Sequence, residues 1–159
     1  MINVLFVCHG NICRSTMAQF VFEDMIRKEG LEDLFLVESA STSRDEIGNG
    51  PHRGTVEKLR REGVPMREHR AVQMVRDDYK KYDYIIGMDE LNMRDMLRIT
   101  GGDKQNKLSL LLDYSTHPRD IADPWYTGDF EVTYNDIVEG CKALLEYLLR
   151  EQGRARISK

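Results

Sequence analysis

The chain opens with a short apolar run that gives way almost at once to helical periodicity. Residues 2–7 read Ile-Asn-Val-Leu-Phe-Val, a β-prone segment typical of a strand buried on both faces. Residues 15–28 then carry apolar side chains at helical spacing, and Gly30 provides a stop. The residues in between, 8–14, must therefore form a tight loop that leads from the end of a strand into the start of a helix.

Strand-like and helix-like segments alternate along the rest of the chain. This alternation is typical of an α/β domain whose parallel sheet is covered by helices on both faces. Ligands of such sheets bind beyond the carboxyl ends of the strands, which is where Cys8 is expected. Further strands are predicted at 34–39, 82–88 and 108–112, helices at 55–62, 90–99 and 132–151, a loop at 43–54, and a strand or an extended connection at 69–75.

The bulk composition narrows the class of protein. The 159 residues suit one domain, which we expect to span residues 1–152 and to be followed by a frayed basic tail at 153–159. A net charge of −4 gives no reason to expect nucleic acid or a membrane as a partner. No stretch reaches the roughly 20 apolar residues of a membrane span, and the opening run is too short for a signal peptide. Three cysteines, an odd number, favour free thiols in a cytoplasmic protein over a disulfide scaffold.

The loop after the first predicted strand has the residue types that a phosphate site needs. It reads Cys-His-Gly-Asn-Ile-Cys-Arg-Ser over residues 8–15. Backbone N–H groups that converge at a helix N-terminus supply several donors to phosphate oxygens at once. Gly10 permits close approach of the backbone, Asn11 tolerates left-handed geometry, and Arg14 adds a planar, permanently charged fork. The sequence therefore predicts a phosphate-binding loop.

The same environment activates a thiol. Helix N-termini and nearby cations lower the pKa of cysteine thiols. We therefore expect a thiolate at Cys8, ready to attack phosphorus and accepting a hydrogen bond from the Ser15 hydroxyl. Two alternatives stay open here: Cys8 and Cys13 pack as inert core residues, or they bind a metal together with histidines. The histidines available for such a site are His9, His52, His69 and His117.

The loop resembles the C-x5-R-[ST] segment of cysteine-dependent phosphatases. Its place at the N-terminus, with Asn11 and Cys13 inside it, resembles the low-molecular-weight protein tyrosine phosphatases, as do Asp-Glu at 89–90 and Asp-Pro-Trp-Tyr at 123–126. The resemblance implies a single three-layer α/β domain with a four-stranded, mostly parallel, twisted sheet. It also implies hydrolysis of phosphotyrosine in proteins, and of small aryl phosphates, through a cysteinyl-phosphate intermediate. Inorganic phosphate would be the product, with no metal or other cofactor, and the protein is expected to be a monomer.

The resemblance also assigns roles to individual residues. Asp123 is the general acid for the leaving group and then the base that activates water, and Arg14 clamps the phosphate. Cys13 either packs in the core or forms a reversible disulfide with Cys8, and the resemblance favours the disulfide. Phosphate binding is expected from His9, Gly10, Asn11, Ile12, Cys13, Arg14 and Ser15. Support of the loop is expected from Asn11, Ser15, Ser39 and His69, and lining of the pocket from His9, Asp45, Ile47, Trp125 and Tyr126.

Four positions depart from the pattern of the family. His9 and Asp45 stand where relatives often carry an aliphatic and an aromatic residue, which leaves the substrate preference open. Thr16 and Gln19 stand where relatives usually have Pro and Glu, and neither change is expected to affect the chemistry.

Two rival functions remain to be separated from a phosphatase. An arsenate reductase on the same scaffold needs further redox cysteines, and only Cys141 is left, on a predicted helix. A module that binds phosphoproteins without turnover fits the loop equally well, but it leaves Cys8 and Asp123 unexplained.

Overall fold

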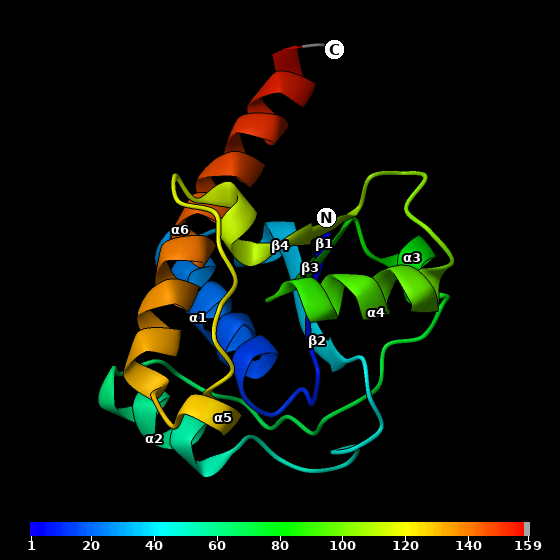
Figure 1. Cartoon of the computed structure of the whole chain (residues 1–159). Coiled ribbons are helices and arrows are strands. Elements are labelled where there is room, and N and C mark those ends of the chain that lie inside the picture. Colours follow the sequence, from blue (N-terminus) through cyan, green and yellow to red (C-terminus); the bar gives the residue numbers. More distant parts are fainter. Residues whose placement is uncertain (158–159) are drawn as a thin grey trace.

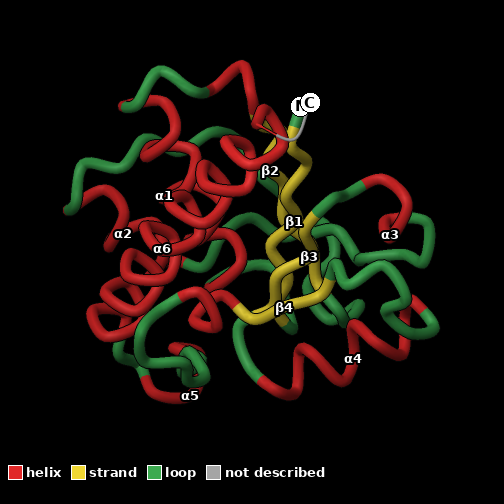
Figure 2. The backbone as a smooth tube through the Cα atoms, turned by 90° about the horizontal axis from the view of Figure 1, so that it is seen from above, coloured by secondary structure: helices red, strands yellow, loops and turns green. Residues whose placement is uncertain are grey.

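The computed structural model describes residues 1–157, which form a four-stranded sheet. Its strands are β1 (Ile2–Cys8), β2 (Phe35–Ser41), β3 (Tyr84–Gly87) and β4 (Leu108–Leu110). They lie in the order β2-β1-β3-β4, and every neighbouring pair is parallel. Because β2 and β3 flank β1, the strand order switches beside β1 (Figure 2). The predicted parallel sheet is confirmed, and Cys8 lies at the switch point where such sheets bind ligands.

Helices cover both faces of the sheet, as predicted (Figure 1). On one side lie α1 (Arg14–Lys28), α2 (Arg53–Arg61) and α6 (Phe130–Ile157), and on the other lie α3 (Asp78–Lys81) and α4 (Glu90–Thr100) (Figure 2). Shorter turns are η1 (Glu32–Leu34), η2 (Leu111–Tyr114) and α5 (Pro124–Thr127).

The side chains of β1 alternate between two apolar cores. Val4, Phe6 and Cys8 belong to the core shared with α1 and α6, whereas Leu5 and Val7 belong to the core shared with α4. A strand buried on both faces explains why the opening run has no polar alternation. It also fixes the end of β1 rigidly, so Cys8 is held by the centre of the fold.

Local sequence signals set both ends of α4. Asp89 is the N-cap, and its Oδ1 accepts the backbone N–H of Asn92 at 2.8 Å. Gly101 ends the helix in the left-handed conformation, with φ of 76°. Asp89 therefore stands just beyond β3, at the same edge of the sheet as Cys8.

Residues 69–75 form an extended connection and not a further strand. Their link to the sheet is one isolated parallel bridge between Ser41 and Gln73. The backbone N–H of Val72 donates to Asn11 Oδ1 at 3.2 Å, so this segment braces the phosphate loop.

Most predicted boundaries shift by one or two residues, and at two of them the type of structure also differs. The run at 108–112 is a strand only through Leu110, because η2 follows directly and the Asp113 carboxylate accepts the N–H of Leu110 at 2.9 Å. Helix α6 begins before residue 132 and continues through Ile157, so the backbone of 153–157 is helical where a frayed tail was expected. Residues 158–159 of that tail lie outside the described residues.

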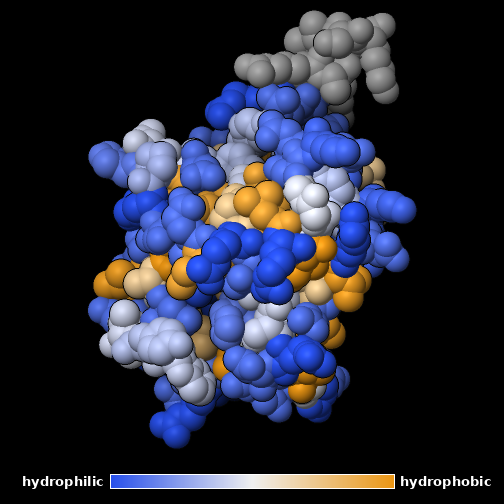
Figure 3. Space-filling model, turned by 45° about the vertical axis from the view of Figure 1, so that its right-hand side comes forward, coloured by the Kyte–Doolittle hydropathy of each residue, from blue (hydrophilic) through white to orange (hydrophobic). Residues whose placement is uncertain are grey.

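The outer surface is mostly hydrophilic on the face shown in Figure 3, where polar residues divide the apolar ones into several patches. Within residues 1–157, no helix combines the length and the apolar character needed to cross a membrane.

Candidate active site

Three hydrogen bonds converge on the sulfur of Cys8. The Ser15 hydroxyl lies 3.0 Å from Sγ, and the backbone N–H groups of Asn11 and Ser15 donate to it at 3.3 and 3.4 Å. The side chain is buried at the end of β1, next to the N-terminus of α1. Donors of this kind, together with the positive end of a helix, stabilise a thiolate.

Asn11 shapes the loop as predicted, since its φ is 58° and its side chain is fully buried. The orientation of its carboxamide is fixed because Oδ1 accepts the N–H of Val72. The amide nitrogen therefore faces the other way and donates to Ser15 Oγ at 2.8 Å and to Ser39 Oγ at 3.0 Å. Each predicted supporting residue of the loop is brought to this one amide.

The directions of two further hydrogen bonds follow from that orientation. Ser15 Oγ accepts from Asn11, so its own proton is directed at the sulfur of Cys8. His69 Nε2 lies 3.0 Å from Asn11 Oδ1, so this ring nitrogen carries the hydrogen. Burial and the nearby Arg67 cation lower the pKa of His69, which keeps the ring neutral.

Gln19 and Thr16, which were not expected to act at the site, also hold the loop. The Ser39 hydroxyl donates to Gln19 Oε1, and the Thr16 hydroxyl donates to the carbonyl of Asn11 at 2.8 Å. The expectation for these two positions concerned the chemistry alone and did not include this support. The sequence signal for this support was position, because Thr16 and Gln19 both lie in the first turns of the helix that follows the loop.

Arg14, the first residue of α1, is buried, and its guanidinium contacts two acidic side chains. Its Nη1 donates to Asp89 Oδ2 at 2.6 Å and to the carbonyl of Ile121 at 2.8 Å, and Nη2 donates to Asp123 Oδ2 at 3.4 Å. Burial opposes the charge, but the Cys8 sulfur and the two carboxylates outweigh it, so the pKa of Arg14 is raised. The pairing of Arg14 with Asp89 was not predicted, although an acidic residue just after β3 was a usable signal.

Asp123 is positioned by the short helix α5. It is the N-cap, its Oδ1 accepts the N–H of Trp125 at 3.0 Å, and Pro124 occupies the first turn. Its other oxygen points to Arg14. The Asp-Pro pair therefore projects a carboxylate toward the loop instead of marking a plain turn.

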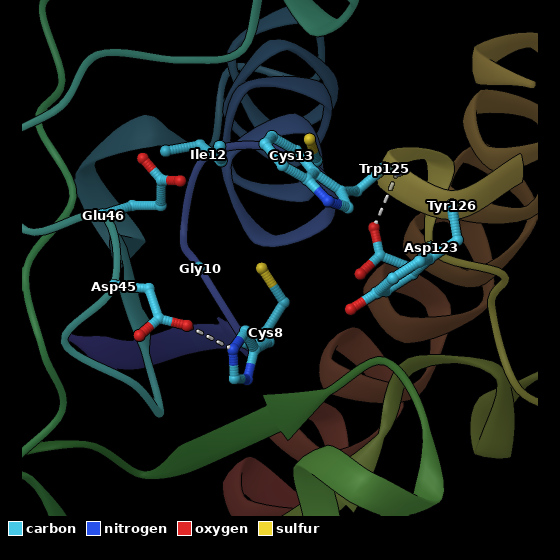
Figure 4. A pocket seen from close by; sticks show the side chains of 10 residues that line it. Cys8, Gly10, Ile12, Cys13, Asp45, Glu46, Asp123, Trp125 and Tyr126 are labelled. Carbon is cyan, nitrogen blue, oxygen red and sulfur yellow. Dashed lines mark hydrogen bonds and ion pairs between the residues drawn. The ribbon is translucent and has the colours of Figure 1, made fainter. Parts of the chain in front are cut away.

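A hollow of about 150 Å³ opens above Cys8 (Figure 4). Asp45 and Glu46 stand on one side of it, and Asp123, Trp125 and Tyr126 stand on the other (Figure 4). The two aromatic side chains are 57% and 83% exposed, so they form a wall open to solvent. The full lining is Cys8, His9, Gly10, Ile12, Cys13, Asp45, Glu46, Asp123, Trp125 and Tyr126. Ile47, also expected to line the pocket, is not part of this lining, and Glu46 takes that place.

Aromatic contacts hold Trp125 beside the hollow. The His52 ring packs edge-to-face with Trp125 and stacks on Phe130, with ring centroids 5.7 and 5.3 Å apart. His52 also caps α2, because its Nδ1 accepts the N–H of Gly54 at 3.0 Å. Helix α2 therefore connects to the aromatic wall, a link that the sequence did not suggest.

Cys13 and Cys141 differ sharply from the nucleophile candidate. Burial, together with Cys8 and Asp123, raises the pKa of Cys13 to about 12. Complete burial likewise raises the pKa of Cys141, which lies in the apolar core on α6. Both are neutral thiols near pH 7. Among the side chains that the structure describes, no three from His, Cys, Asp or Glu are grouped to hold a metal ion.

The fold and this site define an α/β domain with a C-x5-R phosphate loop of the cysteine-dependent phosphatase type. Residues 3–154 match the family model described as "Low molecular weight phosphotyrosine protein phosphatase". The chain therefore belongs to the low molecular weight phosphotyrosine protein phosphatase family.

Individual relatives cover nearly the whole chain. It is 42% identical over 154 residues to the low molecular weight protein-tyrosine-phosphatase YfkJ of Bacillus subtilis, covering 96% of this chain and 99% of the relative. It is 40% identical over 149 residues to the human low molecular weight phosphotyrosine protein phosphatase, covering 91% and 94%. The crystal structure of YfkJ superposes with a TM-score of 0.92 and covers 95% of this chain and 96% of that one.

Proposed function

We propose that this protein hydrolyses phosphotyrosine in protein substrates in two steps, with Cys8 as nucleophile, Arg14 as phosphate clamp and Asp123 as acid and base. Membership of the family makes it a protein tyrosine phosphatase, a hydrolase with phosphoprotein substrates. The observation that carries the assignment of residues is the convergence of three hydrogen bonds on the sulfur of Cys8. A cysteine that only packs in the core does not need these donors, whereas a nucleophilic thiolate is stabilised by them.

In the first step, the Cys8 thiolate attacks phosphorus. The backbone N–H groups of the loop and the start of α1 bind the phosphate oxygens. The sulfur–phosphorus bond forms as the bond from phosphorus to the tyrosine oxygen breaks, and Asp123 donates its proton to that oxygen. The products are tyrosine and a cysteinyl phosphate.

In the second step, the Asp123 carboxylate takes a proton from water as the water attacks phosphorus. The bond between phosphorus and the Cys8 sulfur breaks, and the thiolate is restored with the help of the Ser15 hydroxyl at 3.0 Å. Inorganic phosphate leaves, and Asp123 is protonated for another turnover.

Both terminal nitrogens of the Arg14 guanidinium donate hydrogen bonds, and the lengths of these bonds indicate how the side chain binds phosphate. Its bond to Asp123, at 3.4 Å, is the longest of its three, whereas that to Asp89 is 2.6 Å. We infer that Asp89 keeps the guanidinium in place while the weaker contact to Asp123 is exchanged for phosphate oxygens. The exchange also frees Asp123 for proton transfer.

We further propose that the enzyme also accepts small aryl phosphates and that oxidation of Cys8 regulates it. Trp125 and Tyr126 contact a flat aryl ring, so small aryl phosphates are turned over as well. A peroxide oxidises the Cys8 thiolate to a sulfenic acid, and the Cys13 thiol then displaces water to form a disulfide. The protein acts as a monomer in the cytoplasm, with residues 1–152 as its domain.

The test is hydrolysis of p-nitrophenyl phosphate and of a phosphotyrosyl peptide in the presence of a chelator. We expect turnover by the wild type, none above background for Cys8→Ser, and peptide turnover reduced about 10²- to 10⁴-fold for Asp123→Asn. Asn is also a good N-cap, so this variant keeps α5 while it removes the proton donor. Wild-type binding of the phosphopeptide without turnover would instead establish a binding module, and loss of activity in chelator would indicate a metal.

A further inference from the structure

A hydrogen bond at the mouth of the hollow joins two loops that are distant in sequence. His9 Nε2 lies 2.9 Å from Asp45 Oδ2, and both side chains are more than half exposed. His9 belongs to the phosphate loop, and Asp45 belongs to the loop that follows β2. The dashed contact beside Cys8 in Figure 4 shows this pair.

The loop after β2 holds Asp45 at the mouth through Ser43. The backbone N–H and the hydroxyl of Ser43 both donate to the carbonyl of His9, at 3.1 and 2.9 Å. The Ser43 hydroxyl oxygen also accepts the N–H of Asp45 at 3.3 Å. The carboxylate is therefore fixed beside the hollow by its backbone as well as by the histidine.

Glu46 adds a second carboxylate on the same side. Its Cγ lies 3.5 Å from where a Cβ on Gly10 would be, so the side chain packs over the phosphate loop. Asn49 donates to one of its carboxylate oxygens at 2.6 Å and holds that orientation. Asp45 and Glu46 together are called the acidic rim below.

Among the residues that the structure describes, no lysine or arginine lines the hollow to balance the acidic rim, and His9 is the sole basic side chain in the lining. Arg44 precedes Asp45 along the chain but is outside the lining. Arg14 and Arg94 border a neighbouring hollow along α4, which shares His9, Asp123 and Tyr126 with this one. Among the described residues, none donates to the second oxygen of Asp45, Oδ1, so this oxygen can accept a cation from the substrate.

From this placement we propose that the acidic rim selects phosphotyrosyl peptides that carry a lysine or arginine next to the phosphotyrosine. The proposal rests on the proposed function, because the loop must first bind the phosphate. With the phosphate above Cys8, a neighbouring basic side chain reaches Asp45 and Glu46, whereas a neighbouring acidic one meets two like charges. Asp45 and Glu46 are thus specificity-determining residues, and His9 shields one of them in part.

The test compares two phosphotyrosyl peptides that differ only in having Lys or Glu on both sides of the phosphotyrosine. We expect wild-type kcat/KM to be higher for the Lys peptide, by about two- to fivefold for each carboxylate as for exposed ion pairs. Asp45→Asn and Glu46→Gln should each lower the ratio of the two values, and the double variant should bring it near one. The ratio should also shrink as salt is raised.

Two further variants make the result specific. Asp33→Asn removes one exposed negative charge before β2, at the opposite edge of the sheet, and should leave the ratio unchanged. His9→Leu removes the shielding partner and keeps both carboxylates, so the ratio should stay at or above that of the wild type. A fall toward one in His9→Leu would overturn the assignment to the carboxylates.

The outcomes separate this inference from the proposed function. If the wild type turns over p-nitrophenyl phosphate but hydrolyses both peptides equally, the acidic rim does not select substrates. Preference for the Glu peptide would also overturn the inference and assign the selection to His9. Failure to turn over any of the three substrates would refute the phosphatase assignment itself.

Discussion

The side-chain amide nitrogen of Asn11 lies 2.8 Å from Ser15 Oγ, which in turn lies 3.0 Å from the sulfur of Cys8. The amide cannot turn round, because Val72 donates its backbone N–H to the amide oxygen. The proton of Ser15 is thereby directed at the nucleophile. The side chain of Asn11 thus fixes the direction of the hydrogen bond that the nucleophile receives from Ser15.

Replacing Asn11 should damage both stability and catalysis. Asn11→Ala removes the donor to the buried Ser15 and Ser39 hydroxyls and the acceptor for His69, and we expect the free energy of unfolding to fall by about 2–4 kcal/mol. Because Ser15 can then rotate away, kcat should fall at least tenfold at a temperature where the variant is folded. Denaturant titration and steady-state kinetics measure the two effects.

Asn106 offers a matched control for the backbone. It has φ of 57°, almost the same as Asn11, but it is exposed and distant from the site. Asn106→Ala should cost only the strain of a left-handed alanine, about 1 kcal/mol, and leave kcat unchanged. Equal kinetic losses in the two variants would contradict the role given to the Asn11 amide.

Asp89 has two separable roles that two substitutions should resolve. Asp89→Asn keeps the cap of α4 but removes the charge that holds Arg14, so Arg14 pairs more tightly with Asp123. We expect kcat/KM to drop about tenfold or more with little change in stability. Asp89→Ala should show the same kinetic loss and also lower the free energy of unfolding by about 1 kcal/mol. A kinetic loss confined to Asp89→Ala would mean that only the cap matters.

The three cysteines should differ in their reaction with iodoacetamide. A thiol like Cys13, whose pKa is about 12, is ionised to only about one part in 10⁵ at pH 7. We therefore expect rapid alkylation of Cys8 alone in the folded protein, blocked by inorganic phosphate, as read by peptide mass spectrometry. Cys8→Ser should leave Cys13 and Cys141 unlabelled until the protein is denatured. Labelling of Cys13 at the rate of Cys8 would disprove this difference.

His69 should make stability depend on pH below its usual pKa of 6.5. Its pKa is lowered in the folded protein, so the unfolded chain binds the proton first as the pH falls. The free energy of unfolding therefore decreases from pH 6.5 downward until the folded ring is also protonated. His69→Gln retains a donor without a titrating ring, and it should flatten this part of the profile. His117→Gln, at an exposed ring, should leave the profile as it is; equal profiles for all three proteins would count against a buried neutral His69.

Local sequence was enough to predict the core of the site. The apolar run of β1, the periodicity of α1 and the glycine and asparagine between them specify a strand, a loop and a helix, because each signal acts over a few neighbouring residues. The left-handed Asn11 and the capping Asp89 were readable for the same reason, whereas the cap at Asp123 was found only in the structure. The roles of Asp123, Ser39 and His69 needed the resemblance to a family, since nothing local distinguishes them.

Tertiary structure decided which polar side chains pair across the fold. Arg14 and Asp89 are 75 positions apart, and His9 and Asp45 are 36 apart. Because β1, β2 and β3 are parallel, their carboxyl ends lie side by side at one edge of the sheet, and the residues that follow them can form these two pairs. The sequence by itself therefore determined that Cys8 lies at the end of a buried strand and begins the phosphate loop. Only the packing of that edge determined that Asp89 would anchor Arg14 and that Asp45 and Glu46 would form an acidic rim, because pairing at long range depends on strand order and not on neighbours in the chain.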